Sequence, residues 1–79
     1  MDDSELTRRI AELVEEEHRL ENSEHGPRDP EVAARVRELE IELDRAWDLL
    51  RQRRARRHAG EDPDDAVERP AGTVEGYQQ

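Results

Sequence analysis

The chain has 79 residues, of which 32% are hydrophobic and 44% are charged, and its formal net charge at pH 7 is −9. A chain this short and polar cannot bury a large core, so we expect a single domain at most and no enclosed substrate pocket. Cysteine is absent, which excludes disulfides and thiolate metal sites. No apolar run has the length of a signal peptide or a membrane span. The sequence therefore predicts a soluble, cytoplasmic protein without a membrane partner.

The N-terminal segment has the start signal and the spacing of an amphipathic helix. Asp2 offers an N-cap carboxylate, and Glu5 follows at the spacing of a capping box. Apolar side chains then recur at steps of four and three, although Glu17 interrupts the stripe. The pattern predicts a helix from about residue 3 to residue 25, ended by Gly26 and Pro27. Its apolar positions are Leu6, Ile10, Leu13 and Leu20.

A second, longer helix has clear signals at both ends. Asp29 is a good N-cap, Pro30 suits the first helical position, and Gly60 suits the left-handed position that ends a helix. We expect a helix over about residues 30–59, roughly 43 Å long. Trp47 flanks its apolar seam, and we expect this side chain to contribute most to packing and to be at least partly shielded by Thr7, Arg8 or a partner chain. The seam consists of Val32, Val36, Leu39, Leu43, Ala46 and Leu50.

The two helices are joined by residues 26–29, a connection so short that they must be antiparallel neighbours. The sequence thus predicts an all-α fold, an antiparallel two-helix hairpin that resembles a coiled coil and occupies residues 1–60. Residues 61–79 form an acidic appendage. Asp62 and Pro63 repeat the N-cap and first-position pair, which predicts a short helical turn to about Glu68. The remainder is expected to be an extended, flexible tail that becomes ordered only if it finds a partner or packs back onto the hairpin.

A basic run ends the second helix and is the most conspicuous candidate for function. Residues 51–60 carry a net charge of +5, whereas residues 1–25, 26–50 and 61–79 carry −6, −3 and −5. The run could contact the phosphates of a nucleic acid. Alternatively, it pairs within the molecule, with the acidic start of the chain and the acidic residues after Gly60. We favour this second interpretation because the whole chain is acidic and no aromatic side chain is interleaved with the arginines. Its members are Arg51, Arg53, Arg54, Arg56 and Arg57.

Catalytic and metal chemistry find little support in the pattern. Glu15 and His18 have the E-x-x-H spacing of helical metal sites, but they point away from the seam, and the second helix has no matching motif. No glycine-rich phosphate loop is present, and no hydroxyl side chain has a histidine and an acid placed around it. We therefore expect no enzyme activity, no metal, no cofactor and no small-molecule substrate.

Two apolar residues do not fit the seam of the hairpin. Relative to Leu43, Ile41 lies about 160° away around the helix, and Leu49 lies about 120° away on the other side. Each could be an ordinary exposed apolar residue, or both could be covered by another chain. Because a lone hairpin rarely buries enough surface, self-association into a four-helix arrangement would stabilise it.

We expect a non-catalytic helical interaction module that forms a homodimer or docks on a larger protein. The alternative is a nucleic-acid-binding or ribonucleoprotein-associated factor that uses the basic run. The candidate interaction residues are Ile41, Trp47, Leu49, Tyr77 and the arginines Arg51, Arg53, Arg54, Arg56 and Arg57.

The segment from Leu43 to Tyr77 carries a family resemblance. The string LDRAWDLLRQRRARRHAGEDPDDAVERP, followed by VEGY, resembles the signature of a family of small actinobacterial proteins that is catalogued as a domain of unknown function. The resemblance is most specific at residues 47–54, 60–63 and 74–77. It implies a small, stand-alone helical protein and implies nothing about its chemistry.

Overall fold

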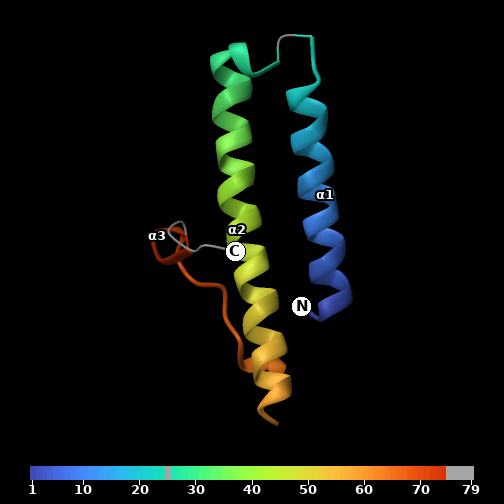
Figure 1. Cartoon of the computed structure of the whole chain (residues 1–79), viewed down its shortest axis with the longest axis vertical. Helices are drawn as coiled ribbons and strands as arrows, with labels where there is room; N and C mark the ends of the chain where they lie inside the picture. The colour runs from blue at the N-terminus through green and yellow to red at the C-terminus, as the bar shows by residue number, and fades with distance from the viewer. Residues whose placement is uncertain (25, 75–79) are drawn as a thin grey trace.

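The computed structural model describes residues 1–24 and 26–74. Two long helices, α1 (Asp3–Glu21) and α2 (Pro30–His58), run antiparallel and form a hairpin (Figure 1). A short 3₁₀ helix, Gly26–Arg28, lies between them; a second one, Pro63–Asp65, follows α2 and precedes the one-turn helix α3 (Ala71–Val74). The molecule is elongated, with extents of 48 × 24 × 17 Å. The predicted all-α hairpin is confirmed.

Both long helices begin at the predicted N-caps. The Asp2 carboxylate accepts a hydrogen bond of 2.8 Å from the backbone N–H of Glu5, and Asp29 accepts one of 2.8 Å from Glu31. These bonds satisfy amide groups that the first turn of a helix leaves without partners. Short-range sequence signals therefore determine where each helix starts.

The end of α2 also follows the prediction. Gly60 adopts φ +77°, the left-handed conformation that side chains other than glycine rarely tolerate. Its N–H donates to the carbonyl of Arg57 at 3.2 Å, and the N–H of Glu61 donates to Arg56 at 2.7 Å. This pair of bonds is a Schellman motif, which reverses the chain direction after α2.

Helix α1 ends at Glu21, four residues before its predicted end at about residue 25. The side chain of Asn22 donates to the carbonyl of His18 at 2.9 Å, and the hydroxyl of Ser23 donates to Leu20 at 2.8 Å. These polar side chains satisfy the last helical carbonyls and so end the helix early. Residue 25 itself lies outside the described residues.

The core lies along the interface between α1 and α2 and consists of residues from the two predicted seams. Leu39 is fully buried, and Leu13 is 2% exposed. Trp47 is 37% exposed, so it is partly shielded as expected, but it lies outside this core. That it contributes most to packing stays a prediction. The buried apolar side chains are Leu6, Ile10, Leu13, Leu39, Leu43, Ala46 and Leu50.

Residues 61–74, which we call the C-terminal segment, pack back along α2. Figure 1 shows residues 66–74, in dark orange to red, on the side of α2 away from α1. The helical turn expected to reach Glu68 ends at Asp65, after which the chain extends from Ala66 to Pro70 and then forms α3. Helix α2 is therefore covered on two sides. No helix in the described parts of the chain is long and apolar enough to cross a membrane.

Candidate interaction surface

The basic run at the end of α2 is held largely within the molecule. Arg53 donates from Nε to the Asp3 carboxylate at 2.6 Å and from a terminal nitrogen to Asp64 at 3.0 Å and to the carbonyl of Pro63 at 3.2 Å. Its side chain is only 7% exposed. One arginine thus joins α1, α2 and the C-terminal segment, as the charge pattern predicted.

Two further arginines of the run pair with carboxylates. Arg57 donates to Asp3 at 2.8 Å, and Arg56 lies 3.4 Å from Glu61. The hydrogen bonds from Arg53 and then from Arg57 hold the pKa of Asp3 below its ordinary value. The same network raises the pKa of Arg53, chiefly through the hydrogen bond to Asp3. Asp3 is therefore ionised at neutral pH and serves as a common acceptor for two arginines.

Arg54 differs from these neighbours. Its side chain is exposed, and it makes no ion pair with any residue that the structure describes. Arg51 is half-buried beneath the C-terminal segment, in a groove that it shares with Asp48 and Arg69. The five arginines therefore do not form one open basic surface.

A buried carboxylate fixes the C-terminal segment to α2, and sequence reasoning did not find it. Asp48 is 1% exposed and forms a bidentate pair with Arg69, in which it accepts hydrogen bonds from both Nε and a terminal nitrogen of the arginine. Gln52 donates to Asp48 at 2.9 Å and to the carbonyl of Val67 at 2.8 Å. Arg45 donates to the carbonyl of Arg69 at 2.9 Å and lies 3.0 Å from Glu68. The hydrogen bond from Arg69 is the main cause that lowers the pKa of Asp48.

The two apolar residues outside the predicted seam have different positions. Leu49 was expected to point away from the hairpin, but it is half-buried and packs against the edge of the core beside Leu6 and Ala46. Ile41 is half-buried on α2. Their roles in an interaction remain predictions, and Tyr77 lies outside the described residues.

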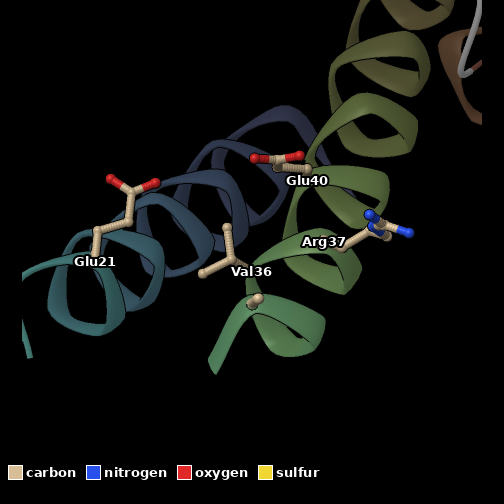
Figure 2. A pocket seen from close by; sticks show the side chains of 5 residues that line it. Glu21, Val36, Arg37 and Glu40 are labelled. Atoms are coloured by element: carbon tan, nitrogen blue, oxygen red, sulfur yellow. The ribbon is translucent and has the colours of Figure 1, made fainter. Parts of the chain in front are cut away.

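An open groove of about 360 Å³ lies between α1 and α2 near the turn of the hairpin. Figure 2 shows Val36 directed from α2 toward α1, flanked by the carboxyl groups of Glu21 and Glu40, with Arg37 turned away. Glu17, in the α1 seam, is half-buried, and desolvation is the main cause that raises its pKa, followed by the charges of Glu21 and Glu40. The seam is thus incompletely covered here, and its carboxylates are crowded.

Metal ligands do not converge in the described residues. No group of three or more histidine and acidic side chains within residues 1–24 and 26–74 is arranged to hold an ion. Glu15 and His18 are both exposed on α1. The hydroxyl of Ser23 is engaged in the turn, where it donates to Leu20 and accepts from the N–H of Gly26 at 3.1 Å.

These features define a small helical protein in which a hairpin and a returning C-terminal segment are joined by arginine–carboxylate pairs. The chain belongs to the family described as "Protein of unknown function (DUF2630)", whose model matches residues 2–79. This confirms the resemblance found in the sequence.

The curated relatives are mycobacterial. The chain is 51% identical over 77 residues to an uncharacterized protein of Mycobacterium bovis, and the match spans 95% of this chain and 88% of the relative. Uncharacterized proteins from two strains of Mycobacterium tuberculosis match to the same extent. No solved structure matches the chain.

Proposed function

We propose that this protein is a non-catalytic helical interaction module and that it binds another protein chain along the uncovered side of the α1–α2 interface. The observation that carries this proposal is the position of Trp47. It projects from α2 with 37% of its surface exposed, although α2 is covered by α1 on one side and by the C-terminal segment on another. Partly exposed tryptophan is enriched at the centres of protein interfaces.

The groove near the hairpin turn extends this surface. Val36 and Ala33 line it on α2, and Glu21 lines it on α1. Apolar side chains bordered by charged ones form the usual anatomy of a protein-binding patch, in which a dry centre is surrounded by a polar rim. A partner bound in this groove would cover a third side of α2, in addition to the sides covered by α1 and by the C-terminal segment.

The arrangement of the basic run does not favour the alternative, a nucleic-acid-binding or ribonucleoprotein-associated factor. Arg53, Arg56 and Arg57 already have carboxylate partners. The phosphates of a nucleic acid would have to displace those carboxylates, and they would be repelled by a chain of net charge −9. A cytoplasmic location and the lack of catalysis remain predictions of the sequence.

The proposal can be tested by site-specific photo-crosslinking in a mycobacterial host. A photo-reactive amino acid replaces Ala33, which lines the groove, and in a control variant it replaces Glu15, which is exposed on the outer face of α1. We expect a discrete cross-linked protein from position 33 and none from position 15. Mass spectrometry then shows whether the product is a second copy or another protein. Equal yields from the two positions would contradict a binding surface at the groove.

A further inference from the structure

Three residues of α2 lie in one line beside the groove, and the character of their side chains changes along that line. Glu40, Trp47 and Arg54 are separated by seven residues each. Seven residues make almost two full helical turns, with a drift of only about 20°, so the three positions form one stripe along α2. All three side chains are exposed. From one end to the other, the stripe therefore presents an acidic, an aromatic and a basic side chain.

The two charges of this stripe remain available to another molecule. Within the described residues, neither Glu40 nor Arg54 takes part in an ion pair or a side-chain hydrogen bond. Three arginines on other sides of α2 do have carboxylate partners. Arg35 pairs with Glu16 at 2.8 Å, Arg45 pairs with Glu68, and Arg53 pairs with Asp3. Glu40 and Arg54 thus carry unpaired charges on the side that also exposes Trp47.

The stripe is complementary to itself when it is reversed. Glu40 and Arg54 lie about 21 Å apart along the helix, and Trp47 is midway between them. A two-fold axis through Trp47 brings each glutamate opposite the arginine of the other copy and places the two indoles against each other. A parallel arrangement would instead place glutamate beside glutamate and arginine beside arginine, which is repulsive.

We propose that two copies of this chain associate through this stripe, with their α2 helices antiparallel, Trp47 packed on the second copy's Trp47, and Glu40 paired with the second copy's Arg54. The proposal rests on the interaction module described above and names its partner. The same surface serves both copies, as a two-fold interface requires. The assembly is a four-helix arrangement that covers the open side of both hairpins.

A second copy fits this surface better than an unrelated partner because the charges of the stripe are arranged symmetrically about Trp47, the only tryptophan of the chain. An unrelated protein would need its own base and acid at the same spacing around an apolar site. The chain itself supplies both at equal distances from Trp47. Crowding of Glu17 with Glu21 and Glu40 adds a further reason for Glu40 to take a cationic partner.

The test uses charge reversals that should complement one another. Alone, Glu40→Arg and Arg54→Glu each create two like-charge contacts across the two-fold axis, and we expect the dissociation constant of each variant to rise at least about tenfold. Mixed in equal amounts, they restore opposite charges at both contacts and should form a heterodimer. The double variant E40R/R54E should also dimerise. Sedimentation equilibrium measures each species, and circular dichroism confirms folding.

Trp47 gives an independent signal, since it is the only tryptophan in the chain. Its emission in the wild-type protein should shift to shorter wavelength as concentration rises through the dimer transition, and Trp47→Ala should abolish association. The matched control variants are Glu15→Arg and Arg8→Glu, which change exposed charges on the outer face of α1 and should leave the dimer unchanged.

Three results would overturn the dimer. These are a wild-type monomer throughout the micromolar range, a dimer unaffected by the single reversals, and single variants that fail to associate when mixed. A cross-link from position 33 to a different protein would in that case still support the interaction module. The failure of the two proposals can therefore be told apart.

Discussion

Arg53 on α2 and Asp3 at the start of α1 lie 50 positions apart in the chain, and a hydrogen bond of 2.6 Å joins Nε of the arginine to Oδ1 of the aspartate. Arg53 also donates to Asp64 in the C-terminal segment. This side chain is largely withdrawn from solvent, so its charge needs both carboxylates. The contact links the three parts of the molecule where α2 extends past the start of α1.

The first prediction concerns this link. Asp3→Asn should lower the urea midpoint of unfolding at neutral pH, because it removes the charged acceptor shared by Arg53 and Arg57. Arg54→Gln is the matched control, measured below the concentration at which the chain associates, and it should leave the midpoint unchanged. An equal effect of both substitutions would show that the Asp3 contact adds no specific stability.

The second prediction concerns the Asp48–Arg69 pair. Asp48→Asn should cost about 2 kcal/mol of unfolding free energy, since a buried, charge-assisted pair is lost. Hydrogen exchange should rise first in the C-terminal segment, which this pair fastens to α2. If exchange there matched the wild type while α1 and α2 were destabilised, the pair would not be what holds the segment.

The pH dependence of this pair has a defined sign. The folded-state pKa of Asp48 is lowered from its ordinary value of 3.8 by the hydrogen bond from Arg69. Its stabilising contribution is therefore complete above that value and is lost as the pH falls through the lowered pKa. The difference between wild type and Asp48→Asn should shrink only in this acidic range.

Much of the hairpin could be predicted because its signals are local or periodic. The caps at Asp2, Asp29 and Gly60 act over a few residues, and the seam follows from helical spacing. The pairing of the basic run could be predicted from charge alone, since acidic blocks lie on both sides of it in the sequence. The burial of Arg53, in contrast, depends on how far α2 extends past α1.

The Asp48–Arg69 pair could not be predicted, because its partners are 21 positions apart and belong to segments with no shared periodicity. By helical spacing Asp48 points away from the seam and resembles a solvated residue. Only the path of the C-terminal segment buries it. Trp47 lies outside the core although it is close to the seam in angle, because the apolar face of α1 is too narrow to cover it fully.

The third prediction compares the core with the exposed stripe. Leu39 is fully buried, so Leu39→Ala should cost about 3 kcal/mol. Trp47→Ala should cost clearly less when the protein is dilute and monomeric, because the indole lies outside the core. Chemical denaturation at two protein concentrations measures both effects. A larger loss from Trp47→Ala in the dilute monomer would confirm the packing role that the sequence predicts for this tryptophan.

The fourth prediction concerns Glu17, whose pKa is raised mainly by desolvation and then by Glu21 and Glu40. Ionised Glu17 therefore lowers stability at neutral pH, and this penalty disappears as the pH falls below its ordinary value of 4.5. Glu17→Gln should raise the unfolding free energy at pH 7 and make no difference in the acidic range. Glu15→Gln, on the exposed face, is the control. Destabilisation by Glu17→Gln at pH 7 would mean that the carboxylate makes a favourable contact.

The last prediction separates the interaction module from a nucleic-acid-binding factor. We expect the wild-type protein to show no binding to mixed RNA at micromolar concentration and physiological salt, because three arginines of the run are neutralised by carboxylates. Filter binding measures this directly. Binding by phosphate contact would weaken steeply between about 50 and 200 mM salt, and Arg53→Gln, Arg54→Gln and Arg57→Gln together would abolish it. Asp3→Asn sharpens the test, since it frees Arg53 and Arg57 from a shared acceptor. If the arginines stabilise the fold, Asp3→Asn should lower the free energy of unfolding without creating RNA affinity. Tight, salt-sensitive RNA binding by the wild type would instead show that the basic run is the functional surface.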